Sequence, residues 1–478
     1  MSHSDEDIGS VYSALDNAKT GKIHYKIAAL SAAGTLLDGY DISIIAVALL
    51  LLYNIPAFGL VTPLAKALIA ASTLIGMIFG GIIFGYITDL KGRKTMYMFD
   101  MAIFIVMTVI ISLSFNFASL FISRLILGVA LGADYAISPA IIAEFTPVRS
   151  RGKFLVTNVL FWSVGAAVAV FTGYALLPLG SVAWRYMFIL GVIPAAVVFY
   201  LRKDIPESAR WLVKSGDIEK AQEVERSVTG KHDSLKDLPS RKSSIKELFS
   251  KRYLKSTVFV AVFWFCMDVT YYGIAIFSPT ILSILGLTSR LAVLGAGVFD
   301  LFSIIGGIIA LLVIDRLGRR LITIIGFAGT TASLVVLGIV TYFVPKFSID
   351  AAIAPIIFGT FLVFELIQNV GPGTTDFVYP IELFPTSERA TAQGFGTSVS
   401  RVGAVLGITT FPFIVLSFGI SGSLFFFGAF ALIGLLVTIL LAPETGRKSL
   451  EACSEPEVII PATSRVEVQT PAEMGGDE

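Results

Sequence analysis

An acidic residue lies between two aromatic residues at helical spacing in the second half of the chain. Asp268 comes four residues after Trp264 and four residues before Tyr272, so all three share one face of a helix. An acid flanked by aromatic rings can orient a polar ligand through hydrogen bonds while the rings enclose it. Because an aromatic residue on a buried helix more often packs in the core, the prediction of a ligand site depends on Asp268.

Other ionisable residues lie inside long apolar runs, where a charge is costly and usually marks a functional site. They are Asp38, Asp41, Arg124, Asp134, Glu365 and Asp376. Asp41 and Arg124 could pair, and burial and the cation would then act in opposite directions on the acid, so that it can change its protonation state. With Asp38, they are the candidates for moving a proton. The alternative is a static buried ion pair that fixes helix packing.

Three charged motifs occur twice in the chain, about half its length apart. The pairs are residues 89–94 and 315–320 (315 − 89 = 226), residues 144–147 and 382–385 (382 − 144 = 238), and residues 206–210 and 443–447 (443 − 206 = 237). Internal repetition of this kind indicates one unit that was duplicated and fused. Parallel repeats are one way in which membrane transporters are built.

The acids and cations of these motifs could form a gate. An acid at a helix end, followed by a glycine turn and clustered cations, can pair with the other half of the molecule in one conformation and release it in another. The alternative is that these charges anchor the helices at lipid headgroups. The recurrence of the acids in both halves favours a gate, for which the candidates are Asp89, Arg93, Glu144, Arg151, Asp315, Arg319, Glu382 and Arg389.

Membrane-spanning helices must position these residues. Hydrophobic residues make up 55% of the 478 and charged residues 15%, and the apolar runs repeatedly exceed the ~18 residues that a crossing needs. About twelve runs start near residues 24, 66, 94, 117, 153, 184, 254, 291, 321, 350, 390 and 421. Their cationic ends fall on one side, which is cytoplasmic by the positive-inside rule. The predicted fold is an all-α membrane protein with twelve transmembrane helices in two pseudo-symmetric six-helix lobes.

A hydrophilic stretch near the middle divides the chain. The predicted parts are a cytoplasmic N-terminal segment (1–23), a six-helix lobe (24–201), a cytoplasmic linker (202–253), a second six-helix lobe (254–443) and a cytoplasmic, largely disordered tail (444–478). The linker is expected to form short amphipathic helices, or else only a solvated connection. We expect a plasma-membrane protein with both termini in the cytoplasm.

Composition and motifs also exclude several classes of function. The net charge of +1 provides no basic field for nucleic acid. The sequence contains no phosphate-binding loop, metal-ligand cluster or nucleophile motif. We therefore expect no enzyme, no cofactor and no metal site.

The charged motifs resemble those of the major facilitator superfamily, over residues 24–451. Residues 85–94 are similar to its cytoplasmic loop motif, and the second copy keeps all but the leading glycine, which is Leu311. Residues 206–212 and 443–447 are similar to its sugar-porter branch. The resemblance implies two lobes that rock about a central solute site.

Two segments resemble phosphate/proton symporters of the superfamily more specifically. They are residues 264–273, which contain Asp268, and residues 132–138, which contain Asp134 and Tyr135. The resemblance implies that these residues contact the solute.

Three positions depart from the phosphate symporters. Trp162 replaces a glutamine, Gly373 an asparagine and Arg401 a lysine. Arg401 keeps a cation that can bind an oxyanion through two hydrogen bonds, whereas Trp162 fills volume. These departures favour a larger anion with an apolar or aromatic part. A sugar is not favoured, because the glutamine pair and the tryptophan of sugar porters align with Cys266, Met267 and Phe377.

The leading hypothesis is a secondary transporter that couples protons to the movement of a small anionic solute, phosphate or an organic acid, by alternating access. The positions of Asp41 and Arg124 are similar to the pair that couples protons in sugar/proton symporters of the superfamily. A sugar-like porter of neutral solutes and an uncoupled facilitator are the alternatives, and a transport-fold sensor is a remote one. The expected partners are the solute, protons and the lipid bilayer, with no nucleic acid, and the protein is expected to act as a monomer.

Overall fold

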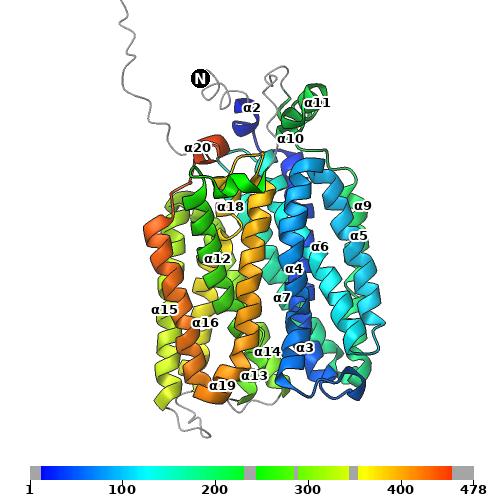
Figure 1. Ribbon diagram of the computed structural model, residues 1–478, viewed down its shortest axis with the longest axis vertical. Coiled ribbons are helices and arrows are strands. Elements are labelled where there is room, and N and C mark those ends of the chain that lie inside the picture. The colour runs from blue at the N-terminus through cyan, green and yellow to red at the C-terminus, as the bar shows by residue number, and fades with distance from the viewer. Residues whose placement is uncertain (1–11, 231–243, 285–288, 344–353, 455–478) are drawn as a thin grey trace, which may run out of the picture.

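The computed structural model describes residues 12–230, 244–284, 289–343 and 354–454, which fold mainly into helices (Figure 1). Ten helices in these residues are long and apolar enough to cross a membrane. Two of the ten, Arg151–Arg202 and Arg389–Leu441, contain 52 and 53 residues, more than twice the ~20 residues of one crossing. Each of these two crosses twice, so the described chain makes twelve crossings.

Both long helices turn at a glycine with positive φ. The angle is 70° at Gly180 and 71° at Gly419, a conformation that glycine adopts without a clash of Cβ. The two glycines are 419 − 180 = 239 residues apart, close to the offsets of two of the charged motifs. The duplication therefore extends to the backbone turns.

The first six crossings form one lobe and the last six form the other (Figure 1). The first lobe consists of α3 (Lys22–Leu52), α4 (Pro63–Lys91), α5 (Arg93–Ser112), α6 (Phe117–Phe145), α7 (Arg151–Leu176), and α8 (Ala183–Ile189) with α9 (Val192–Arg202). The second consists of α12 (Leu254–Ala275), α14 (Ser289–Leu317), α15 (Arg319–Phe343), α16 (Ala354–Val370) with α17 (Pro372–Thr375) and α18 (Tyr379–Leu383), and α19 (Arg389–Leu441), with the short α13 (Ser278–Ile284) after α12.

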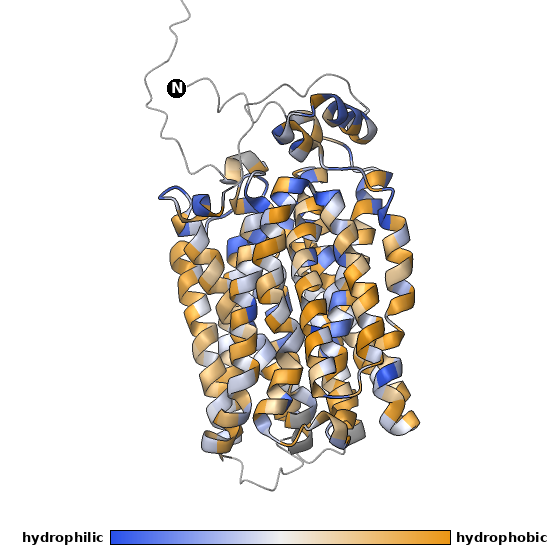
Figure 2. Ribbon diagram, turned by 45° about the vertical axis from the view of Figure 1, so that its right-hand side comes forward, coloured by the Kyte–Doolittle hydropathy of each residue, from blue (hydrophilic) through white to orange (hydrophobic). Residues whose placement is uncertain are grey.

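The outward faces of both lobes are apolar along most of their length (Figure 2). Val106, Leu312 and Leu440 are 53%, 63% and 73% exposed. Apolar surface of this extent on a soluble protein would mark a contact with another apolar phase. Here the apolar faces run along membrane-length helices, so the lipid hydrocarbon is the phase that covers them.

The two lobes approach each other most closely where α4 lies beside α19 (Figure 1). A Cβ atom on Gly394 would lie 2.0 Å from the carbonyl oxygen of Gly81, and one on Gly85 would lie 2.5 Å from that of Ala390. Real Cβ atoms do not approach this closely. Glycine at these positions therefore allows the two backbones to meet.

Several short helices lie together at one end of the bundle, which we call the linker end (Figure 1). They are α2 (Ser13–Asp16), α10 (Ala209–Ser215), α11 (Ile218–Thr229) and α20 (Leu450–Ser454). The predicted linker contains α10, α11 and the 3₁₀ turn η3 (Ile245–Phe249), but Arg202, expected in the linker, is the buried last residue of α9. Residues 455–478 of the predicted tail lie outside the described residues.

Candidate functional site

A cavity of about 410 Å³, which we call the inner cavity, lies between the two lobes. Six of the eight predicted ligand contacts line it: Tyr135 on α6 and Trp162 on α7, and Asp268, Tyr272, Gly373 and Arg401 from the second lobe. Side chains of both lobes therefore surround one central space. This is the position of the solute site in transporters that work by movement of one lobe against the other.

Arg401 on α19 is the buried cation of the inner cavity. Its Nη1 lies 3.3 Å from Oδ2 of Asp268 and donates a hydrogen bond of 2.7 Å to the hydroxyl of Tyr272. The guanidinium also lies 5.0 Å from the ring centroid of Tyr135 and 5.1 Å from that of Tyr272. A tyrosine of each lobe thus contacts the cation, whose charge is balanced by Asp268.

Three donors of the residues that line the inner cavity are buried without a hydrogen-bond partner among the described residues. They are Nε1 of Trp162, Nε2 of Gln368 and Nε of Arg401. Buried donors are nearly always hydrogen-bonded, and each unmet one is destabilising. A ligand whose acceptor oxygens reach these atoms would satisfy them, and the buried atoms without a hydrogen bond also include both carboxylate oxygens of Asp268.

Aromatic rings separate the inner cavity from a second space, which we call the outer cavity. The ring centroid of Trp162 lies 6.0 Å from that of Tyr271 and 6.3 Å from that of Tyr272, and the two tyrosine rings are 5.4 Å apart, all edge to face. All three residues line both cavities. The outer cavity, of about 460 Å³, lies toward the end opposite the linker end and is also lined by Ser43 and Asp300.

Two of the predicted ligand contacts lie elsewhere. Trp264 is fully buried and packs against Phe377, with ring centroids 5.7 Å apart, so it lies behind the cavity wall. Asp134 points into the first lobe and forms an ion pair of 3.0 Å with Arg202. Consecutive residues of a helix point in directions about 100° apart, and here Tyr135 faces the cavity while Asp134 faces Arg202. Neither Trp264 nor Asp134 lines the inner cavity in this structure.

Asp41 and Arg124 are brought together inside the first lobe. Arg124 Nη1 lies 3.5 Å from Asp41 Oδ2, and Arg124 Nε donates a hydrogen bond of 3.1 Å to Ser72. Both charged side chains are almost fully buried. Because the contact is long for an ion pair, protonation of Asp41 would remove an attraction without breaking a tight pair of hydrogen bonds.

Asp38 belongs to a different cluster. It lines a small cavity with Asp100 and Asp134, and Arg202 pairs with Asp100 at 3.2 Å as well as with Asp134. The spacing of three residues turns Asp38 and Asp41 to adjoining faces of α3. The structure therefore separates the predicted proton carriers into the Asp41–Arg124 pair and an acidic cluster that holds Asp38.

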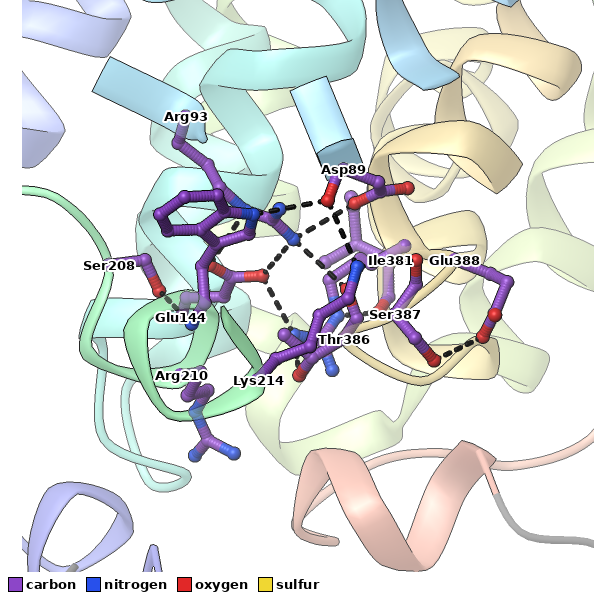
Figure 3. A network of polar contacts seen from close by, with 12 residues as sticks. Asp89, Arg93, Glu144, Ser208, Arg210, Lys214, Ile381, Thr386, Ser387 and Glu388 are labelled. Carbon is purple, nitrogen blue, oxygen red and sulfur yellow. Dashed lines mark hydrogen bonds and ion pairs between the residues drawn. The ribbon is translucent and has the colours of Figure 1, made fainter. Parts of the chain in front are cut away.

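Three of the predicted gate residues, Asp89, Arg93 and Glu144, belong to one network of polar contacts with residues of the linker and the second lobe (Figure 3). Within the first lobe, Arg93 binds Glu144 through Nε at 3.1 Å and Nη2 at 2.8 Å, and it lies 3.0 Å from Asp89. Across the lobes, Arg389 Nη1 lies 3.2 Å from Glu144, and Asp89 Oδ2 accepts hydrogen bonds from the backbone and hydroxyl of Thr391 at 2.8 and 2.7 Å. These contacts hold the linker end closed.

The second lobe repeats the gate within itself. Arg319 binds Glu382 through Nε at 3.1 Å and Nη2 at 2.9 Å, and it lies 3.4 Å from Asp315. Arg151 occupies the position that corresponds to Arg389, but its Nη2 pairs with Asp16 of α2 at 2.9 Å. The two halves of the gate therefore share their internal geometry and differ in their contacts across the lobes.

The linker takes part in the closed end. Glu207 accepts hydrogen bonds from the backbone N–H groups of Arg93 and Lys94, at 2.9 and 3.1 Å. Burial raises the pKa of Glu207, while these bonds oppose the rise. Lys214 donates to the carbonyls of Asp89 at 2.9 Å and Ser387 at 3.4 Å, and burial lowers its pKa. This part of the linker thus packs against predicted gate residues and contacts both lobes.

Several residues of these sites were missed by the sequence analysis. Asp100 and Asp300 are single acids inside apolar runs, the same signal that identified Asp268, and it could have found them. Tyr271 and Gln368 give no such signal, because an aromatic or amide residue in a span is commonly part of helix packing. Their position at the cavity depends on how each helix is rotated.

Known proteins resemble this chain over nearly its whole length. The family model described as sugar (and other) transporter matches residues 27–456. The putative metabolite transport protein YaaU of Escherichia coli (strain K12) is 32% identical over 446 residues, which cover 92% of this chain and 96% of that protein. The solved structure of XylE, a proton:xylose symporter of the major facilitator superfamily, matches with a TM-score of 0.76 at 22% identity, over 90% of this chain and 99% of XylE.

Relatives with more specific names point to different solutes. The putative inorganic phosphate transporter 1-13 of Oryza sativa subsp. japonica is 28% identical, with coverage of 92% of this chain and 93% of that protein. The niacin transporter NiaP of Acinetobacter baylyi is 27% identical, with coverage of 92% and 98%. The comparisons therefore agree on a transporter and differ on what is carried.

Proposed function

This chain belongs to the sugar (and other) transporter family, and we propose that it is a proton-coupled symporter of a small organic acid. It is a multi-pass integral membrane protein and a transporter rather than an enzyme. The observation that carries the proposal is Arg401, a buried cation in a cavity between two lobes. A guanidinium binds a carboxylate through two parallel hydrogen bonds.

The surroundings of Arg401 favour an organic acid over phosphate or a sugar. The unmet donors of Trp162, Gln368 and Arg401 suit a compact group of acceptor oxygens. The rings of Tyr135, Trp162 and Tyr271 give the rest of the cavity an aromatic lining, which suits a flat apolar body. The relative named as a niacin transporter is consistent with such a solute.

Charge balance at Arg401 suggests how a proton is coupled to the solute. Asp268 already pairs with Arg401 at 3.3 Å, so a solute carboxylate must compete with it. A proton on Asp268 would remove the competing charge and free Arg401 for the solute. Proton and anion would then bind together, and Asp41 beside Arg124 provides a second group that can carry a proton.

Alternating access follows from the gate. The contacts of Glu144 and Asp89 with the second lobe close the linker end, and their release would open the inner cavity to that side. The clustered cations at this end favour a cytoplasmic location. We place both termini in the cytoplasm and the protein in the plasma membrane, where it acts as a monomer.

The test is uptake by purified protein in proteoliposomes with an inward proton gradient. The panel comprises phosphate, benzoate, nicotinate, succinate and a hexose, with protein-free liposomes to correct for acids that cross the bilayer in neutral form. We expect gradient-stimulated uptake of a monocarboxylate that Arg401→Gln reduces at least tenfold. Hexose uptake that is independent of the proton gradient and unchanged in Arg401→Gln would refute the proposal and indicate a facilitator of neutral solutes. Preferred uptake of phosphate would refute an organic acid as the solute.

A further inference from the structure

The outer cavity contains an acid that the proposed function does not use. Asp300 of α14 lines this cavity, and its charged neighbour is Glu365, another acid, which accepts a hydrogen bond of 2.7 Å from Ser303. Among the described residues, no lysine or arginine forms an ion pair with Asp300 or Glu365. Asp300 is therefore an acid of the outer cavity that pairs with no lysine or arginine of the described residues.

The balance of charge along the solute path points the same way. Arg401 is paired with Asp268 in the inner cavity, where Asp376 is a second acid. Among the described residues that line the two cavities, Arg401 is thus the one arginine, and the acids are Asp268, Asp376 and Asp300, with Glu365 beside Asp300. A solute that carried only a negative charge would bind Arg401 but would leave the acids on the outer side without a partner. A solute with a positive group at its other end would be attracted there.

The wall between the two cavities suits a cation. Trp162, Tyr271 and Tyr272 contact one another edge to face and line both cavities. The faces of such rings attract organic cations, and several rings around one space form the usual site for a quaternary nitrogen. Two of the rings, those of Trp162 and Tyr271, come from opposite lobes, so both lobes would hold the same group.

We propose that the solute is a zwitterion, with a carboxylate on Arg401 in the inner cavity and a permanently cationic nitrogen among the three rings, facing Asp300. This inference rests on the proposed function, because it requires a carboxylate at Arg401. It adds the class of solute, an organic acid that also carries a quaternary or aromatic nitrogen cation.

A pair of compounds of equal shape tests the proposal. N-methylnicotinate and 3-methylbenzoate share one skeleton and differ in the charged ring nitrogen. Dissociation constants are measured by calorimetry on the purified full chain, for the parent, Asp300→Asn and Tyr271→Leu. We expect the parent to bind N-methylnicotinate about tenfold more tightly than 3-methylbenzoate, and each variant to lose most of this ratio of affinities.

A surface acid provides the matched control. Asp204 is exposed and pairs only loosely with Lys26 at 3.3 Å, so Asp204→Asn should leave the ratio of affinities at the parent value. Equal or weaker binding of N-methylnicotinate by the parent, no binding of either compound, or an unchanged ratio in Asp300→Asn would each overturn the zwitterion. Proton-driven uptake of 3-methylbenzoate that N-methylnicotinate does not inhibit would refute the zwitterion proposal and leave the proposed function intact. The absence of any carboxylate uptake would refute the proposed function itself.

Discussion

Asp268 and Arg401 form the contact on which coupling depends in our proposal. They lie 3.3 Å apart in the inner cavity, and a solute carboxylate and Asp268 compete for the same guanidinium. Solute binding should therefore strengthen as the pH falls and Asp268 takes up a proton. The acid opposes anion binding when it is charged and permits it when it is neutral.

Asp268→Asn should remove this pH dependence. The amide cannot carry a negative charge, so we expect the variant to bind a monocarboxylate with nearly constant affinity between about pH 5.5 and pH 8, whereas the affinity of the parent should fall about tenfold or more as the pH rises. Calorimetric titration of the solute at several pH values measures both curves. If the variant keeps the pH dependence of the parent, the competing charge is not Asp268.

Asp41→Asn should separate solute movement from the proton gradient. Arg124 lies 3.5 Å from Asp41 and also donates a hydrogen bond to Ser72, so the arginine keeps a partner beside the neutral amide, which cannot bind or release a proton. We expect solute exchange across the membrane to continue at a rate within about tenfold of the parent, while gradient-driven accumulation is lost. Accumulation above equilibrium by this variant would show that Asp41 is not required.

The residues of the inner cavity could be predicted only in part from the sequence. Charge and aromatic spacing selected Asp268 and Tyr272, resemblance to phosphate symporters selected Arg401, and all three line the inner cavity. Asp134 was selected by its charge inside a span and by resemblance, and it faces Arg202 instead, because the rotation of α6 decides which side chains reach the cavity. Such rotations are set by packing against other helices, which residue types alone do not specify.

At the scale of helices, the predicted gate combines two similar halves that differ in their contacts. Glu144 binds Arg93 of its own lobe and Arg389 of the other, whereas Glu382 binds Arg319 and Thr445 within the second lobe. Loss of charge at Glu144 therefore removes an ion pair between the lobes, the one with Arg389. Loss of charge at Glu382 removes an ion pair within the second lobe, the one with Arg319.

Glu144→Gln should open the linker end more than Glu382→Gln, which serves as its matched control. Breaking a buried ion pair is worth about 3–5 kcal/mol, and at Glu144 that loss falls on the closed state. Spin labels at Lys91 of α4 and Arg316 of α14, both exposed, report the distance between the lobes. We expect a longer distance to dominate in Glu144→Gln and the parent distance to dominate in Glu382→Gln, and the reverse order would contradict the assignment of the cross-lobe contact.

Gly394→Ala should prevent closure of the same end. The added Cβ would lie 2.0 Å from the carbonyl oxygen of Gly81, so α4 and α19 must move apart. We expect transport to fall at least tenfold and the same spin labels to report separated lobes. Gly359→Ala is the control, since nothing lies within 4 Å of its added Cβ, and it should transport at the parent rate. Normal transport by Gly394→Ala would show that the closed packing is not part of the cycle.

The helices themselves could be predicted closely from the sequence. Runs of apolar residues bounded by charge or glycine indicated spans beginning near residues 117 and 254, where α6 and α12 start. The close packing of α4 on α19 was not predicted, because glycines in a span indicate that another helix can approach closely but do not indicate which helix it is.

At the scale of the whole molecule, two copies of one unit enclose a site that neither copy could form alone. Tyr135 and Trp162 come from one lobe and Asp268 and Arg401 from the other. The repeat of motifs at offsets near 238 predicted the two lobes. The asymmetry between them was not predictable from the repeat: α2 supplies Asp16, which pairs with both Arg151 and Arg210, and the repeat contains no second copy of α2.

The central claim, coupled movement of proton and organic acid, is tested most directly by solute-driven proton entry. Proteoliposomes containing a trapped pH-sensitive dye are held without an imposed gradient, and benzoate or nicotinate is added outside. Protein-free liposomes and Asp41→Asn proteoliposomes are run beside them to subtract entry of the neutral acid. We predict internal acidification that exceeds that of both controls and saturates with solute concentration. If carboxylate uptake is measurable but acidification is no greater than in the protein-free liposomes, the result contradicts proton coupling.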